Sequence, residues 1–247
     1  KFLDTKCRIA GIRPDCVVIV ATVKALKLHG GADKASLSEE NLPALRAGMP
    51  NLYKHIENIR NVYNLPVVVA MNRFASDTPA EIETVMRGVE EAGAKAVFTD
   101  VFLKGGEGGR ELAEAVCAAA EERGMRYAYD LNDPVEKKIE DVVRKVYGGA
   151  GVTFSAVAEE KIADAEKRGY GKLPVIIAKT QYSLSDDAKL LARPEGFTVH
   201  VRDVIVKGGA GFIVAVAGSI MLMPGLGKVP AAEHIDVDEN GEIVGLS

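Results

Sequence analysis

Two lysines, a histidine and a glycine pair lie close together early in the chain, within residues 20–31, which read VATVKALKLHGG. Lys24 and Lys27 offer ammonium groups, and His29 can gain or lose a proton near neutral pH. The preceding residues, 16–21, are apolar and mostly β-branched, which is typical of a buried parallel strand. Open α/β sheets bind ligands where such strands end. The pattern predicts an anion-binding loop, although the same residues taken alone also fit a solvated helix start.

A second group of candidate residues follows the apolar strand expected at 66–71. It consists of Asn72, Phe74, Asp77 and Thr78. A capping side chain, a proline in the first turn and an acid near the positive end of the helix dipole predict that a helix begins here. The segment therefore fits either a helix cap beside one exposed ring or a set of ligand contacts.

A third group follows the strand expected at 95–101 and is rich in glycine: residues 102–109 read FLKGGEGG. Glycines such as Gly105 and Gly106 let a backbone approach a ligand closely and offer N–H groups at the start of a helix. Phe102 stands three residues before Gly105. A glycine-rich loop alone does not specify the ligand.

The order of elements predicts an α/β fold. Over residues 1–130, strands alternate with helices, which favours a parallel sheet flanked by helices, like the core of P-loop NTPases. Two short helices are expected within it, at 41–45 and 51–56. A smaller α/β domain is expected over 131–247, ending in a hairpin with an Asn-Gly turn.

Composition excludes several classes of protein. The chain has 247 residues and a net charge of −4, which argues against binding along nucleic-acid phosphates. Its longest apolar runs are far too short to cross a bilayer, so no membrane partner is expected. Three cysteines without CxxC spacing favour a cytoplasmic location. The four histidines show no metal-ligand spacing, so no metal site is expected.

Together these segments resemble the signatures of formate–tetrahydrofolate ligases. Residues 20–31 match the family's VAT(I/V)R(A/S)LKxHGG except at Lys24, where the family usually has arginine. Residues 72–78 resemble its NxFxxDT pattern, and residues 178–183 read AKTQYS, as the family does. The glycine-rich segment also matches, although Phe102 replaces the usual tryptophan. The resemblance runs through the whole chain and corresponds to about the C-terminal half of such ligases.

The resemblance implies that formate is joined to tetrahydrofolate with ATP, through formyl phosphate, to give 10-formyltetrahydrofolate. It also implies Mg²⁺, an activating monovalent cation and a homotetramer. Phe74 and Phe102 would then sandwich the pterin ring. The remaining roles that the resemblance implies are catalysis by Lys24, Lys27 and His29, further folate contacts from Asn72, Asp77, Thr78, Gly105 and Gly106, and a nucleotide side formed by Gly30, Gly31, Pro224 and Gly225.

The family's P-loop, GxxxxGK(S/T), does not occur in this sequence, which begins with Lys1. We therefore expect a fragment, or one part of a split or homo-oligomeric ligase, that does not activate formate alone. Two alternatives stay open. One is a catalytically silent module that binds folate or a partner chain. The other is a P-loop-like nucleotide-binding protein that resembles the ligases in architecture only.

Overall fold

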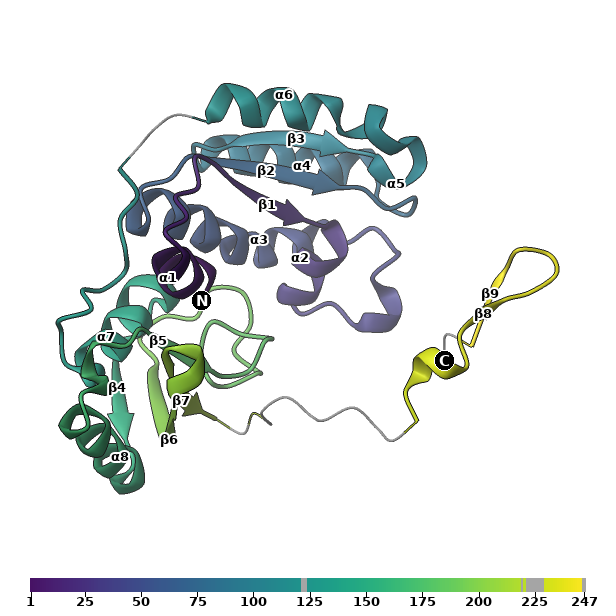
Figure 1. Cartoon of the computed structure of the whole chain (residues 1–247). Coiled ribbons are helices and arrows are strands. Elements are labelled where there is room, and N and C mark those ends of the chain that lie inside the picture. The colour runs from purple at the N-terminus through teal and green to yellow at the C-terminus, as the bar shows by residue number, and fades with distance from the viewer. Residues whose placement is uncertain (121–123, 219, 221–228, 246–247) are drawn as a thin grey trace.

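The first three groups of candidate residues follow the strands of a parallel three-stranded sheet (Figure 1). The computed structural model of the chain describes residues 1–120, 124–218, 220 and 229–245. The strands, in the spatial order β1-β2-β3, are β1 (Val17–Ala21), β2 (Val67–Asn72) and β3 (Lys95–Thr99). Val17 lies opposite Val67, and Val68 opposite Lys95. The predicted α/β fold with a parallel sheet is confirmed.

Helices cover both faces of this sheet. On one face lie α2 (Val23–His29), α3 (Leu42–Glu57) and α4 (Pro79–Glu91), and on the other lies α6 (Arg110–Ala119) (Figure 1). The first face is closed by apolar side chains, among them Val23, Leu26, Leu45, Met49, Leu52, Ile56, Val69, Met71, Val85 and Val89. Their spacing along each helix is that of an amphipathic helix on a sheet. The sheet edge is therefore held on a rigid apolar support.

Two expectations about local structure were wrong. The region predicted to form two short helices is the single helix α3, with Pro50 inside it. A proline removes one helical hydrogen bond, but Leu45, Met49 and Leu52 on the buried face hold the helix together across it. The motif expected to be a loop is mostly helix α2, whose first turn is capped by the Thr22 side chain accepting from Ala25 N–H.

A close helix crossing fixes α2 against α3. A Cβ atom added to Gly30 would lie 1.7 Å from the carbonyl oxygen of Ala44, and one added to Gly48 would lie 1.8 Å from that of Leu26. Real Cβ atoms do not approach backbone this closely, so both positions require glycine. The crossing therefore sets the place of every side chain on α2.

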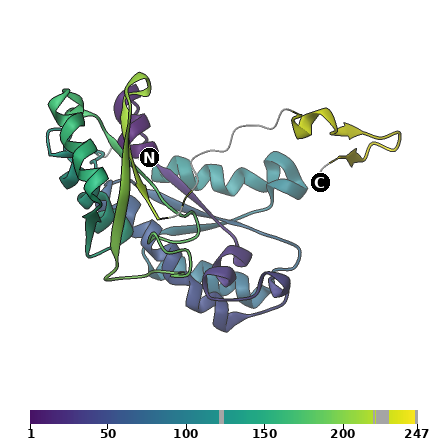
Figure 2. The same ribbon diagram turned by 90° about the horizontal axis from the view of Figure 1, so that it is seen from below.

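The second unit is built on a mixed sheet. Its strands are β4 (Gly151–Phe154), β5 (Val175–Ala178), β6 (Thr198–Lys207) and β7 (Phe212–Ala217), in the order β4-β6-β7-β5, with β6 and β7 antiparallel and the other pairs parallel. Helices α7 (Val135–Asp141) and α8 (Ala156–Lys167) pack on it. Figures 1 and 2 both show these elements grouped apart from the first sheet.

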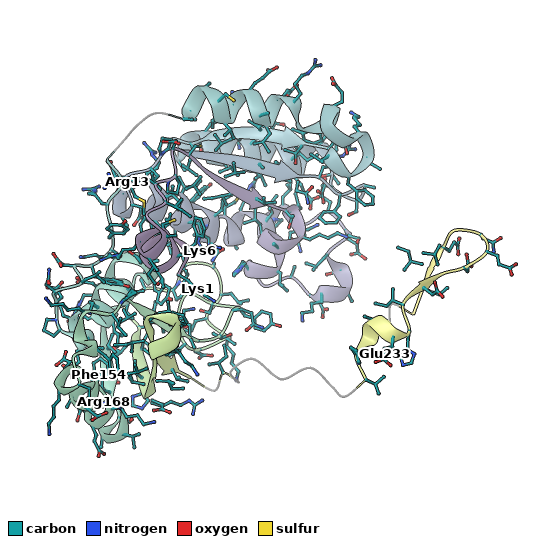
Figure 3. All side chains as sticks on the ribbon, in the orientation of Figure 1. Lys1, Lys6, Arg13, Phe154, Arg168 and Glu233 are labelled. Atoms are coloured by element: carbon teal, nitrogen blue, oxygen red, sulfur yellow. The ribbon has the colours of Figure 1, made fainter. Side chains whose placement is uncertain are left out.

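Residues from the start of the chain complete the core of this second unit. Leu3 and Cys7, on the π-helix η1 (Phe2–Cys7), are buried in one cluster with Tyr63, Leu65 and side chains of β6 and β7. Figure 3 shows Lys6 on this helix and Lys1 at its start, close to the second unit. The expected division at residue 130 stays a prediction, and segments from before it share a core with residues after it.

The remaining elements are short. They are α1 (Arg8–Ala10), η2 (Lys34–Ser36), η3 (Asn58–Val62), α5 (Val101–Lys104), η4 (Gly105–Gly109), η5 (Val142–Tyr147), η6 (Tyr170–Lys172), η7 (Gly208–Ala210), η8 (Ala231–Glu233) and the hairpin strands β8 (Asp236–Val237) and β9 (Ile243–Val244). Among the described residues, none of the helices has both the length and the apolar character needed to cross a bilayer.

β1 is an edge strand with one side open. Its order in the sheet gives it β2 as its only strand neighbour in the described chain. Val18 and Val20, whose side chains share one face, are 39% and 65% exposed, because α6 covers β2 and β3 instead.

We expect Gly48→Ala to lower the free energy of unfolding by about 1–3 kcal/mol, because the new methyl group would force α2 away from α3. In an ordinary helix interior the same change stabilises the helix by about 1 kcal/mol. A loss of stability would therefore show that the two helices are in close contact at Gly48. Chemical denaturation measures it, with Gly106→Ala, which meets open space, as the control. A Gly48 variant as stable as the parent chain would contradict the close crossing.

Candidate functional site

Three candidate side chains follow the carboxyl ends of the three parallel strands of the first sheet. Lys24 lies on α2, which follows β1, Phe74 follows β2, and Phe102 lies on α5, which follows β3. Lys24 Nζ lies 4.9 Å from the centre of the Phe74 ring. This is within the range of a cation–π contact. The sequence grouped Lys24 with Lys27 and His29, whereas the structure places its ammonium beside a predicted folate-binding ring.

Both candidate rings are open to solvent. Phe74 is 41% exposed and Phe102 is 94% exposed, so neither is part of an apolar core. Phe102 stands on the single-turn helix α5, because β3 ends at Thr99, two residues before its expected end. Val101 and Leu103, on either side of Phe102, are exposed as well. Exposed apolar side chains in one place are typical of a surface that binds something.

The glycine-rich segment folds into the 3-10 helix η4 rather than an open loop. Gly108 packs against the start of α5, since its added Cβ would lie 2.3 Å from the Asp100 carbonyl oxygen. Gly105 has φ 56°, where glycine is favoured. An added Cβ on Gly105 or Gly106 would meet nothing within 4 Å. The predicted folate contacts Gly105 and Gly106 therefore face open space beside Phe102, whereas Gly108 is structural.

Asp77 shapes the turn that presents Phe74. One of its carboxylate oxygens, Oδ2, accepts a hydrogen bond from the Phe74 backbone N–H at 2.8 Å, and the Asp77 N–H donates to the Phe74 carbonyl at 3.0 Å. The side chain is buried. Its Oδ1 atom, like Ser76 Oγ, has no hydrogen-bond partner within the described part of the chain. Buried polar atoms are normally paired, so Oδ1 is a free acceptor under the Phe74 turn.

Thr78 and Asn72 lie beside this turn. Thr78 is the N-cap of α4: its hydroxyl accepts from Glu81 N–H at 3.3 Å and donates to Glu40 Oε2 at 2.5 Å. Its hydroxyl is thus engaged in a capping box with Glu81, at the helix start that the sequence predicts. Asn72 ends β2 opposite Thr99 and is half-buried.

Lys27 is not at the sheet edge with Lys24. It is fully buried, and its ammonium donates to Glu81 Oε1 at 2.8 Å and to the Glu39 carbonyl at 2.7 Å. Glu81 Oε1 also accepts from Asn41 N–H at 3.0 Å, and its Oε2 accepts from Thr78 N–H at 3.1 Å. In this structure Lys27 therefore stabilises the packing of α2 against α4 beneath the sheet edge, which differs from the catalytic role expected of it.

The Lys27–Glu81 pair fixes the charge of Glu81. Burial would raise the pKa of this carboxyl, but the Lys27 ammonium and the Asn41 and Thr78 N–H groups outweigh it and hold the pKa below its usual value. A lowered pKa means that this stabilisation is present above the ordinary carboxyl pKa and is lost as the pH falls through the lowered value. The pair is thus fully formed at neutral pH.

The other predicted residues of the first motif point elsewhere. His29 Nδ1 accepts from the backbone N–H of Ala192 at 3.3 Å, and burial lowers the pKa of His29. Gly30 lies in the α2–α3 crossing, and Gly31, with φ 86°, follows the end of α2. Neither glycine is placed beside Phe74. The predicted nucleotide contacts Pro224 and Gly225 lie outside the described residues.

The sequence match agrees with this arrangement. A family model described as formate–tetrahydrofolate ligase matches residues 1–247. The chain belongs to this family. Formate–tetrahydrofolate ligases join formate to tetrahydrofolate, and the family generally uses ATP and Mg²⁺.

Metal-ligating side chains are scattered in the part of the chain that the structure describes. Nowhere in it do three or more histidine, cysteine or acidic side chains gather as they would around a tightly held metal ion. Mg²⁺ that acts on ATP is usually held by only one or two carboxylates together with substrate phosphates, so it needs no such cluster, and no step below is assigned to it.

Two features of the site were missed from the sequence. The inward direction of Lys27 could have been found from helical spacing, since Lys27 stands one residue after the buried Leu26 and four after the buried Val23, but its partner Glu81 could not. The contact between Lys24 and Phe74 joins two separate motifs. Strand order alone could have indicated it, because β1 and β2 are neighbours.

We expect Lys27→Met to lower the free energy of unfolding by about 3–5 kcal/mol, because it leaves the Glu81 carboxylate buried without its cation. Denaturant titration at neutral pH measures the loss, with Lys24→Met, a half-buried lysine on the same helix, as the control. If Lys27→Met kept the parent stability and lost only ligand binding, Lys27 would act on a ligand and not on the fold.

Proposed function

We propose that this chain forms the tetrahydrofolate-binding side of a formate–tetrahydrofolate ligase and takes part in ATP-dependent transfer of a formyl group from formyl phosphate to N10 of tetrahydrofolate. The observation that carries this proposal is the contact of Lys24 with the exposed Phe74 ring after β2, next to the strand β3 that the exposed Phe102 follows. Family membership supports the reaction, and the exposed rings support the substrate side.

The pterin ring is the part of folate that the two phenylalanines suit. It is flat and aromatic, and two exposed rings on adjacent strand ends can pack against its opposite faces. Each aromatic contact of this kind contributes about 0.5–1.5 kcal/mol beyond the buried area. Gly105 and Gly106 add no side chains beside Phe102, so a ligand can come close to their backbone.

The polar edge of the pterin needs hydrogen-bond partners. In this proposal the free Oδ1 of Asp77 accepts an N–H of the ring when the Phe74 turn closes on it. Asn72, at the end of β2, offers an amide on the same edge of the sheet. Thr78 contributes by capping α4 and holding Asp77 in place, since its hydroxyl is already paired.

Lys24 supplies a positive charge that stabilises the transition state of formyl transfer. N10 forms a bond to the formyl carbon, the bond from that carbon to the phosphate oxygen breaks, and N10 releases its proton to water. Negative charge grows on the departing phosphate. An ammonium beside the folate ring stabilises that charge in place, which is the usual largest contribution of an enzyme to acyl transfer. Lysine is a point charge where arginine would bind two oxygens, so its grip on phosphate is weaker.

Formation of formyl phosphate from ATP requires parts that this sequence does not contain. The GxxxxGK(S/T) loop that cradles ATP phosphates is absent from it. A second candidate function is therefore a chain that binds folate or a partner polypeptide without turnover of its own.

Replacing either ring tests the folate assignment. Phe74→Ala and Phe102→Ala should each weaken tetrahydrofolate binding by about three- to tenfold, from the loss of one aromatic contact. Phe102→Trp should strengthen it, because tryptophan offers a larger face. Calorimetric titration measures the affinity, and Phe2→Ala, an exposed phenylalanine on η1, is the matched control. An unchanged affinity in both alanine variants would end the stacking assignment.

Complementation separates the two candidate functions. A polypeptide carrying the P-loop half of a ligase, added to this chain with ATP, formate and tetrahydrofolate, should restore formation of 10-formyltetrahydrofolate, which absorbance detects. The same mixture with Lys24→Met should show much lower turnover. Binding of tetrahydrofolate without any turnover in the mixture would favour the silent module.

A further inference from the structure

A cavity of about 300 Å³ lies between the two units, away from Phe74 and Phe102. His29 at the end of α2 and Asn51 and His55 on α3 form one wall. Tyr147 at the end of η5 and Lys179, directly after β5, form the opposite wall. The histidine of the first motif and the lysine of the AKTQYS segment thus meet in one place.

The lining of this cavity is basic. It contains Lys179 and two histidines, and no aspartate or glutamate is among the residues that line it. The Lys179 ammonium donates to the backbone carbonyls of Thr180, at 3.2 Å, and Ser183, and it lies 4.8 Å from the centre of the Tyr147 ring. Within the described chain it makes no ion pair. A half-buried ammonium whose contacts are all neutral lacks a counter-charge within ion-pair distance.

The cavity wall is firmly built. Ala192 adopts φ 55°, which is costly for a residue with a side chain, and two cavity residues hold it there. Asn51 Nδ2 donates to the Ala192 carbonyl at 2.9 Å, and His29 Nδ1 accepts from the Ala192 N–H at 3.3 Å. Because Nδ1 is an acceptor, neutral His29 carries its proton on Nε2. Strained backbone held by polar side chains is found at ligand sites more often than elsewhere.

We infer that this cavity binds a small anion bearing carboxylate or phosphate oxygens, with Lys179 as its main cation and His29 and His55 as hydrogen-bond donors. The volume is at the lower end of ligand pockets, which are about 300–1,000 Å³, so the ligand is small. The inference does not depend on the proposed function, because it involves neither the pterin rings nor Lys24.

The protonation of the cavity supports this assignment. Burial lowers the pKa of Lys179 to about 8, against a small opposing effect of the Asp186 carboxylate. Burial also lowers the pKa of His29. An anion favours the protonated form of both groups. Its binding therefore takes up protons, and its affinity falls as the pH rises through the Lys179 pKa.

Titration of the full chain with two simple probes tests the inference. Inorganic phosphate and glutarate are each added at low ionic strength, near about pH 6 and near about pH 9.5, and heat is measured in buffers of different ionisation enthalpy. We expect saturable binding with proton uptake near pH 6 and binding at least about tenfold weaker near pH 9.5. Preference for one probe identifies phosphate or carboxylate as the group that is recognised.

Two variants locate the binding. Lys179→Met should weaken it at least about tenfold, whereas Lys172→Met, an exposed lysine on η6, should leave it unchanged. Because Lys179 also bonds backbone carbonyls, its variant can lose stability, so His55→Glu, at an exposed position, provides a second test. It should abolish binding while leaving the melting temperature unchanged, with His55→Gln as its neutral control. No saturable binding of either probe, or parental affinity in folded Lys179→Met or in His55→Glu, would overturn the inference.

Discussion

The buried ion pair between Lys27 and Glu81 ties together the helices that support the sheet edge. Lys27 comes from α2, and the carboxylate of Glu81 on α4 also accepts the Asn41 N–H at the start of α3 and the Thr78 N–H at the start of α4. One carboxylate thus satisfies backbone donors at two helix starts and one ammonium. Removing either charge would leave the other uncompensated in an apolar interior. The positions of Lys24 and Phe74 depend on this junction, since each lies within a few residues of it.

Helix α2 distributes one sequence motif among three environments. A helix turns by about 100° per residue, so residues that are close in sequence point in different directions. Lys24 lies at the sheet edge beside Phe74, Lys27 is in the interior with Glu81, and His29 lines the cavity with Lys179. The motif is therefore less a single binding loop than a helix that connects two separate candidate sites. The Gly30–Gly48 crossing fixes its rotation.

Much of the fold could be predicted from the sequence because its signals are local. Two strands, β2 and β5, lie where the apolar runs at 66–71 and 174–178 predict them. Helix α4 begins where the capping side chain and the first-turn proline predict a helix start. The prediction of two short helices was wrong because burial of one face of α3 outweighs the helix-breaking effect of Pro50. The placement of Lys27 and His29 depends on partners 54 and 163 residues away, Glu81 and Ala192, and no local pattern contains that information.

The open side of β1 is a place where another strand could add to the first sheet. The strand reads VVIVA and contains no charged residue, proline or bulge to protect its free edge. Unpaired N–H and C=O groups beside two exposed valines form a template for another strand. Pairing of two molecules through this edge would extend the sheet from one chain to the next, against the repulsion between their net negative charges.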